Sequence, residues 1–153
     1  ALILKTAKDD LGMDVPFFGG DGLSSDDLIA TGGEAADGIY VTTPFLFGEK
    51  IDTPAATKFR DDFQAMHGKA PDTWAALTYD AISQLLDVVQ QTGTDRAAIR
   101  GALAETTSKE AGFAGITGVT YFDSNGDCIG KPIYVSQVKE GKFAVSDLQL
   151  LDD

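Results

Sequence analysis

Hydrophobic and polar positions in the first third of the chain predict an alternation of helices and short strands. A helical periodicity of apolar residues ends at Gly12, and a continuous apolar run of the kind found in buried parallel strands follows it. Ser24 or Ser25 is placed to cap the next helix. A run rich in β-branched residues then indicates a second strand, which Pro44 ends. The expected order is helix, strand, helix, strand, over 1–11, 15–19, 26–31 and 38–43.

Three consecutive helices are expected next. Thr53 caps the first, which begins at Pro54 and runs to His67. The second is long, from 71–72 to about 91, and Thr94 or Asp95 caps the third, which runs to about 105. Helical spacing predicts that the first two helices bury their apolar stripes. These stripes are Phe59, Phe63 and Met66, and then Ala75, Thr78, Ile82, Leu85, Leu86 and Val89.

The pattern of residues in the last part of the chain predicts β-strands joined by turns. A strand is expected over 117–122, followed by a turn over 123–127. Residues 133–139 alternate between two faces, and Glu140-Gly141-Lys142 is typical of a tight hairpin turn that leads into a final strand over 143–151.

Composition limits the class of protein. The 153 residues carry 24 acidic and 12 basic side chains, a net charge of −12, which disfavours binding to nucleic acid and to anionic membranes. No run approaches the roughly 18 apolar residues of a membrane span. The chain opens without the basic region and cleavage site of a signal peptide, as a mature or trimmed protein would. One cysteine excludes an internal disulfide and fits either a reduced compartment or the periplasm.

A glycine-dense turn with one carboxylate follows the first expected strand. Ligands of open α/β sheets bind at the carboxyl ends of strands. Gly20 and Gly22 admit close approach, and Asp21 between them suits a cationic group such as an α-ammonium. The alternative is that Asp21 only satisfies backbone N–H groups of its own turn.

The other motifs do not indicate a nucleotide site, a metal site or a catalytic nucleophile. The turn glycines lack the third glycine of a dinucleotide fingerprint, and 123–127 departs from a calcium loop at its invariant glycine. His67 is the only histidine, Cys128 has no nearby partner, and Ser24 lacks the surroundings of a nucleophile. We therefore expect no catalytic residue, no metal site and no cofactor.

Trp74, in the first turn of the long helix, is the other residue of interest. It either packs against the neighbouring helix or forms the wall of an apolar pocket beside a ligand. Tyr79 and Asp80, further along the same helix, are expected to make core and polar structural contacts rather than ligand contacts.

Several segments closely resemble branched-chain amino-acid binding proteins, the type I periplasmic binding proteins that serve ATP-driven importers. They occur in the family's order over nearly all of the chain. The segments are 17–22, 33–44, 71–81, 115–118, 123–127 and 132–138.

This resemblance implies an α/β fold with two Rossmann-like lobes joined by three crossovers, of which the chain is a C-terminal portion. Residues 1–42 and 132–153 would belong to the second lobe, and 43–131 to the first. The missing N-terminal half, or a second copy by swapping, would complete the fold.

The resemblance also implies a function. Asp21 would receive the α-ammonium of an amino acid, with Gly20 and Gly22 beside it, and Trp74 would border the ligand's side chain. The protein would capture a branched-chain or related amino acid between its lobes and deliver it to the membrane permease of an ABC importer. It would be periplasmic, or anchored outside the membrane of a Gram-positive cell, and not an enzyme. The alternative is a sensory or regulatory domain of the same fold that binds an amide or aromatic ligand.

Overall fold

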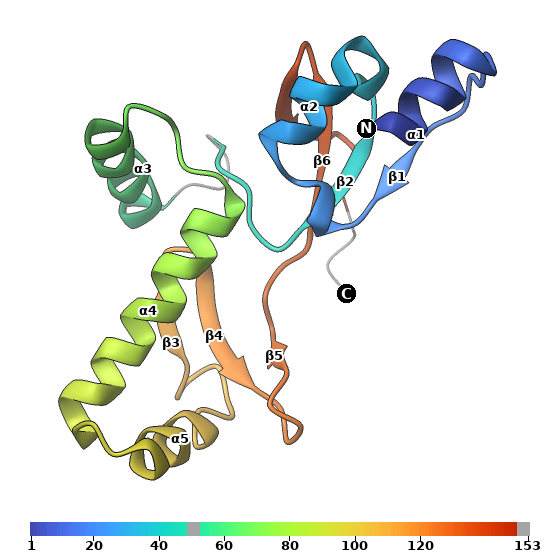
Figure 1. Ribbon diagram of the computed structural model, residues 1–153. Coiled ribbons are helices and arrows are strands. Elements are labelled where there is room, and N and C mark those ends of the chain that lie inside the picture. The colour runs from blue at the N-terminus through green and yellow to red at the C-terminus, as the bar shows by residue number, and fades with distance from the viewer. Residues whose placement is uncertain (49–52, 150–153) are drawn as a thin grey trace. The chain divides into compact units, whose positions relative to one another are not determined.

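The chain divides into two compact units in a computed structural model that describes residues 1–48 and 53–149 (Figure 1). The first unit combines Ala1–Ile51 with Ile133–Asp153, and the second is the continuous segment Asp52–Pro132. Their assignment to two lobes, predicted with boundaries at 42–43 and 131–132, concerns a longer protein and stays a prediction.

A four-stranded mixed sheet forms the centre of the first unit. Its strands are β1 (Phe18–Gly19), β2 (Tyr40–Thr43), β6 (Tyr134–Lys139) and β7 (Lys142–Val145), in the order β1-β2-β6-β7. β1 and β2 pair in parallel, and the other neighbours pair antiparallel. The final strand ends at Val145, so it is shorter than predicted, and the last two positions of its expected range lie outside the described residues.

Helices pack against this sheet and close a small core. They are α1 (Leu2–Lys5), its π-helical continuation η1 (Thr6–Asp10), the 3₁₀ turns η2 (Asp21–Leu23) and η3 (Gly33–Ala36), and α2 (Asp26–Gly32). Ser25 occupies the N-cap of α2, although its side chain makes no capping hydrogen bond. The core consists of Leu4, Leu28, Ala35, Ala36, Ile39, Val41 and Val138.

The predicted hairpin turn between β6 and β7 is confirmed. Glu140 and Gly141 both have positive φ, 53° and 70°, which is the geometry of the two-residue turns that fit the twist of a hairpin. Asp37 supports the turn, because its Oδ1 accepts a hydrogen bond of 2.9 Å from the Glu140 N–H.

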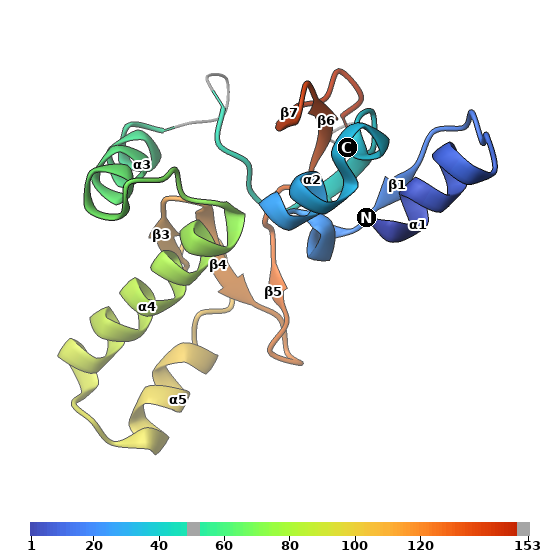
Figure 2. The ribbon, with the colours of Figure 1, turned by 45° about the horizontal axis from the view of Figure 1, so that its top comes forward.

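The second unit contains three helices and a small antiparallel sheet. The helices are α3 (Pro54–His67), α4 (Thr73–Thr92) and α5 (Arg96–Ala104). The sheet order is β3-β4-β5, formed by Phe113–Gly115, Gly118–Phe122 and Cys128–Ile129. α4 lies alongside the β3–β4 hairpin, as both ribbon views show (Figures 1 and 2). Within the described ranges, no helix combines the length and the apolar character that a membrane crossing requires.

Side-chain caps explain why the three helices begin where they do. Thr53, Asp72 and Asp95 each accept a hydrogen bond from the backbone N–H three residues ahead, at 3.2, 2.8 and 2.9 Å. At the other end of α3, Gly68 adopts the left-handed conformation, with φ of 71°. The three predicted helices are therefore confirmed to within about a residue at their beginnings.

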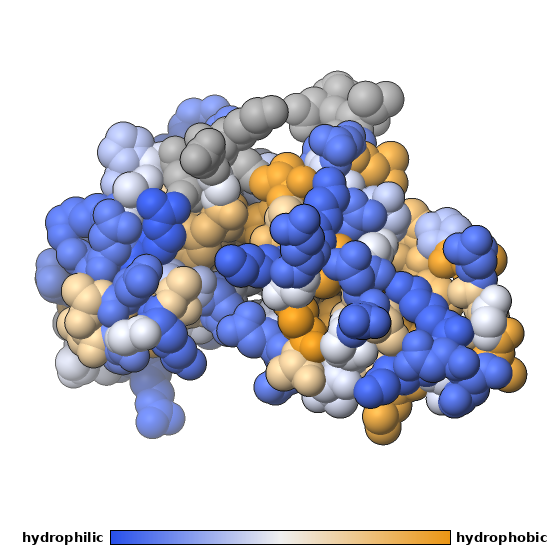
Figure 3. Space-filling view, turned by 90° about the horizontal axis from the view of Figure 1, so that it is seen from above, coloured by the Kyte–Doolittle hydropathy of each residue, from blue (hydrophilic) through white to orange (hydrophobic). Residues whose placement is uncertain are grey.

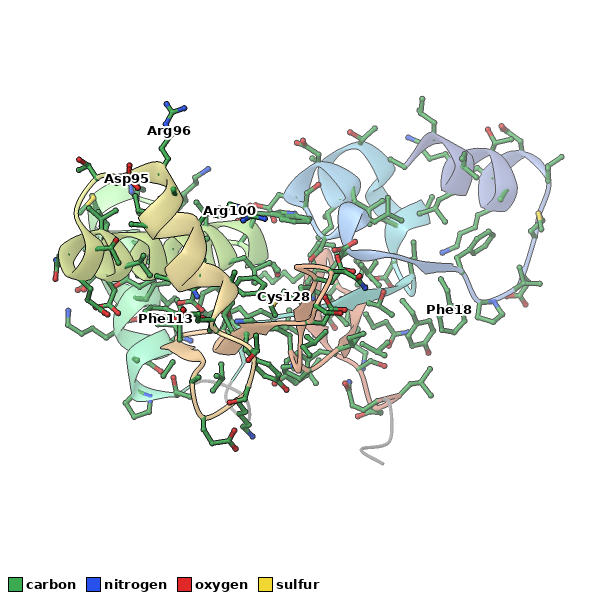
Figure 4. All side chains as sticks on the ribbon, turned by 90° about the horizontal axis from the view of Figure 1, so that it is seen from below. Phe18, Asp95, Arg96, Arg100, Phe113 and Cys128 are labelled. Atoms are coloured by element: carbon green, nitrogen blue, oxygen red, sulfur yellow. The ribbon has the colours of Figure 1, made fainter. Side chains whose placement is uncertain are left out.

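The expected burial of apolar side chains is partly wrong. Met66 is 78 % exposed, Ile82 51 % and Leu86 55 %, while the residues that α4 buries are Thr73, Ala76, Asp80 and Gln84. In the first unit, Phe18 on β1 is 62 % exposed and stacks on Tyr40 (Figure 4). Helical spacing identifies which residues share a face, but burial depends on whether another element covers that face.

Candidate functional site

The glycine turn lies at the carboxyl end of β1, as the sequence predicts. Because β1 and β2 are parallel, their carboxyl ends meet at one edge of the sheet. The Thr42 hydroxyl, near the end of β2, donates to the Gly19 carbonyl at 3.5 Å and links the two strand ends. This edge is where an open α/β sheet binds its ligands.

Asp21 begins the 3₁₀ turn η2 and its side chain is exposed. Its Oδ1 accepts a hydrogen bond of 2.9 Å from the Gly22 N–H, so Asp21 does satisfy one backbone N–H group of its own turn. Among residues 1–48 and 53–149, no basic side chain forms an ion pair with this carboxylate. The carboxylate therefore keeps lone pairs available for a cationic donor.

Gly20 and Gly22 have no local backbone reason to be glycine. Gly20 has φ of −85° and ψ of 178°, an extended conformation open to any residue, and Gly22 does not have positive φ. A Cβ built at either position would meet no atom within 4 Å, whereas one at Gly19 would lie 2.3 Å from Leu23 Cδ1. The space above the turn is therefore open at these two positions.

Trp74 lies in the second unit, in the first turn of α4, and is 43 % exposed. It borders an open groove of about 870 Å³ between α3 and α4. Trp74 therefore shares this groove wall with residues of the neighbouring helix α3, and a contact with a ligand stays a prediction. Tyr79, expected in the core, also lines this groove and is 48 % exposed, with its ring 4.7 Å from that of Phe59.

Most of the groove surface is apolar. Figure 3 shows one face of the whole molecule, on which orange hydrophobic residues lie between blue hydrophilic ones. The large apolar and aromatic residues of the wall include Phe59, Phe63, Met66, Trp74, Tyr79, Ile82, Leu86 and Ile116.

For Ile116 the sequence predicted no role, and for Asp80 it predicted a polar contact without a partner. Ile116, 8 % exposed, enters the groove wall from the turn between β3 and β4. Asp80 is 3 % exposed and accepts hydrogen bonds from that turn, so its expected polar structural role is confirmed. The signal available in the sequence was the turn itself, Gly115-Ile116-Thr117-Gly118.

The other candidate residues of the sequence analysis lie outside the glycine turn. Cys128 is exposed on β5 and forms no disulfide (Figure 4). His67 ends α3, with its ring 4.4 Å from that of Phe63. Asp123 accepts from the backbone N–H groups of Asn125 and Asp127, so 123–127 forms the predicted hairpin turn. Over the described ranges, no three His, Cys, Asp or Glu side chains are grouped to hold a metal ion.

Solved structures similar to this chain are solute-binding proteins. The leucine-binding protein LivK of Thermotoga maritima is 34 % identical, with a TM-score of 0.82, and the match covers 97 % of this chain and 41 % of LivK. LivJ of Streptococcus pneumoniae, a branched-chain amino-acid transporter substrate-binding protein solved with isoleucine, is 28 % identical, with a TM-score of 0.80, over 92 % of this chain and 38 % of LivJ.

A solute-binding protein of an ABC transporter from Rhodopseudomonas palustris, solved with benzoate, is 26 % identical, with a TM-score of 0.69. That match covers 93 % of this chain and 38 % of the relative. The chain thus spans about 40 % of the length of these proteins. No curated protein matched it.

The family model described as periplasmic binding protein matches residues 1–142. The expected fold class is confirmed, with part of a type I periplasmic binding protein fold present in this chain. The chain belongs to the periplasmic binding protein family.

Proposed function

We propose that this chain supplies part of a binding site for an amino acid, in an extracytoplasmic solute-binding protein that delivers its ligand to the permease of an ABC importer. The observation that carries the proposal is the turn at the end of β1. There a carboxylate with no basic partner among residues 1–48 and 53–149 lies between two glycines that the local backbone does not require. Similarity to proteins solved with isoleucine and described as leucine-binding supports an aliphatic amino acid.

Asp21 would pair with the α-ammonium of the ligand. A hydrogen bond between two charged groups is about twice as strong as a neutral one, and it strengthens as water is excluded. Gly20 and Gly22 would let ligand atoms approach the backbone without meeting a side chain. Such pairing would favour ligands that carry an ammonium group.

Trp74 would supply apolar area to the ligand's side chain. Indole is large and rigid, so it contacts a ligand with little loss of side-chain entropy. Its position at the end of the apolar groove, 43 % exposed, leaves ring surface available. Because a ring face discriminates among apolar side chains by shape, Trp74 would set preference more than affinity.

We further propose that more polypeptide of the same protein covers the apolar surfaces of both units. This chain matches 41 % of LivK, and large hydrophobic side chains are exposed on α1, β1, α3 and α4. An α/β unit buries the apolar stripe of each helix against another layer. A second copy of this chain, which would show as a dimer by light scattering, is the outcome that would contradict this assignment.

The test is a thermal-shift screen of the twenty amino acids, benzoate and a simple amide such as acetamide, run on this chain alone and on a full-length protein that contains it. Specific ligands raise the melting temperature in proportion to the logarithm of their concentration above Kd. We expect leucine, isoleucine or valine to stabilise the full-length protein. Stabilisation by benzoate or an amide, with no amino acid active, would favour the sensory alternative. No shift with any compound would refute ligand capture.

A further inference from the structure

The buried carboxylate of Asp80 binds the turn between β3 and β4 in the second unit. Asp80, on α4, is 3 % exposed, and its two oxygens accept hydrogen bonds of 2.8 Å from the backbone N–H groups of Ile116 and Thr117. The Thr117 hydroxyl donates to the same Oδ2. One side chain thus satisfies three donors of the turn between β3 and β4.

The turn is shaped around this carboxylate. A Cβ at Gly115 would lie 2.3 Å from the carboxyl carbon of Asp80, so no other residue fits there without displacing Asp80. Gly118 closes the turn with φ of 100°, a conformation that side chains other than glycine rarely adopt. Ile116, which lies between these two glycines, enters the wall of the groove that Trp74 also lines.

The network continues to the last residues of the unit. Lys131 Nζ donates to the Thr117 Oγ1 at 2.7 Å and lies 3.9 Å from Asp80 Oδ2. Its side chain is 12 % exposed, so the cation is held inside the unit rather than extended into water. The next residue, Pro132, is the last of the second unit.

We propose that Asp80 is a positioning residue that fixes one of the two connections between the units, the one at Pro132–Ile133. It holds the 115–118 turn, and the same turn holds Lys131 through the Thr117 hydroxyl and the Thr117 and Gly118 carbonyls. The chain is therefore fixed to the second unit as far as Lys131, and Pro132 is the first residue at this connection outside the network. This inference goes beyond ligand capture and does not depend on it.

The test uses hydrogen exchange measured by mass spectrometry on three variants. In Asp80→Asn, the amide group cannot accept from both N–H groups, because its nitrogen is a donor. We expect exchange to rise at least about tenfold in peptides over 115–118 and 128–131, while α5 and the last turns of α4 keep their protection. Lys131→Met keeps the two backbone hydrogen bonds of the turn and removes every contact of the ammonium, so only 128–131 should lose protection. Thr117→Val should give a smaller loss there, because Lys131 Nζ also donates to the Thr117 and Gly118 carbonyls at 3.4 and 3.5 Å.

Trp74, the only tryptophan, gives an independent spectroscopic readout. When Asp80→Asn releases the turn, Ile116 leaves the groove wall, and the Trp74 emission should shift to the red. Lys131→Met should leave the emission unchanged, because the turn remains bonded to Asp80. If Asp80→Asn does not fold, Thr117→Val and Lys131→Met still test the link from the turn to the connection.

The matched control is Asp95→Ala, which removes the cap of α5 in the same unit and lowers stability without touching the network. The proposal is overturned if Asp80→Asn raises exchange evenly across the second unit, as a general loss of stability would. It is equally overturned if Lys131→Met leaves 128–131 as protected as in the parent protein.

Discussion

Replacing Gly20 and Gly22 by alanine, one at a time, separates two reasons for glycine in the turn after β1. If the backbone needs glycine, each change destabilises the fold. If a ligand needs the space, each change spares the fold and weakens binding. Gly20 is extended and Gly22 does not have positive φ, and an added Cβ meets no atom within 4 Å at either position. We therefore expect the second result.

Each substitution should raise the free energy of unfolding and weaken ligand binding. Alanine in place of glycine at a compatible position raises the free energy of unfolding by about 0.4–1 kcal/mol, because the unfolded chain loses freedom. For a chain of this size that is a rise of roughly 1–4 °C in melting temperature. An extra methyl group in a filled site costs about 1–3 kcal/mol. The dissociation constant should therefore increase by roughly 5- to 150-fold.

The assay combines thermal melts with calorimetric titration of the ligand found in the screen. Gly19→Ala is a control in the same turn, since its Cβ would lie 2.3 Å from Leu23 Cδ1, at the flexible end of that side chain. Gly115→Ala is a stricter control, because its Cβ would lie 2.3 Å from the buried carboxylate of Asp80. Both controls should lower the melting temperature, Gly115→Ala by more.

Two results would refute the reasoning. Unchanged affinity in Gly20→Ala and Gly22→Ala, together with a raised melting temperature, would mean that no ligand occupies the space above the turn. A fall in melting temperature in both variants would mean that the backbone itself requires glycine there.

Other predictions follow from named contacts. Asp21→Ala should weaken amino-acid binding by about 2–5 kcal/mol in calorimetry, because a buried ammonium loses its partner, and a change within error of zero would remove Asp21 from the site. Trp74→Ala should change the ranking of leucine, isoleucine and phenylalanine in competition titrations, and equal weakening for all three would argue against a role in specificity. Asp80→Ala should lower the free energy of unfolding by about 3–5 kcal/mol in urea melts, because Lys131 and two backbone donors lose their partner, and a loss below about 1 kcal/mol would contradict the buried network. Burial lowers the pKa of Lys131 from its ordinary 10.5, against the opposing attraction of Asp80. Just below pH 10.5, the unfolded chain therefore binds more protons at Lys131 than the folded protein does. In urea melts, the free energy of unfolding of the parent protein should rise relative to that of Lys131→Met as the pH increases toward that value. Parallel pH profiles for the two proteins would contradict this prediction.

Local signals in the sequence predicted the three helices of the second unit and the two hairpin turns, whereas β1 is shorter than the strand expected over 15–19 and β3 was not predicted. Thr53, Asp72 and Asp95 begin helices by bonding to a backbone N–H only three residues away, so the whole interaction is visible in a short window. The hairpin at Glu140-Gly141 is equally local. The glycine turn at Asp21 could be found because it directly follows an apolar run.

Interactions between distant residues could not be predicted in the same way. Thr117 bonds to Asp80 across 37 positions, and nothing near either residue announces the pairing. The apolar stripe of α4 was recognised as one face, but its exposure depends on which elements lie over it. Ile82 and Leu86 are therefore correctly placed on one side of the helix and wrongly assigned to the interior.

The order of strands in the first unit has a consequence during synthesis. Ser136 on β6 donates its hydroxyl to the Val41 carbonyl on β2, 95 positions earlier in the chain. Closing a loop of about 90 residues costs about 4 kcal/mol of chain entropy. A ribosome adding 5–20 residues per second takes roughly 5–20 s to reach β6 after β2. During that interval β2 has no antiparallel neighbour, whereas Asp52–Pro132, a continuous segment, is already complete when β6 emerges. An intervening unit that folds early would shorten the loop that remains to be closed, and the nascent chain would expose the edge of β2 to other chains for less time.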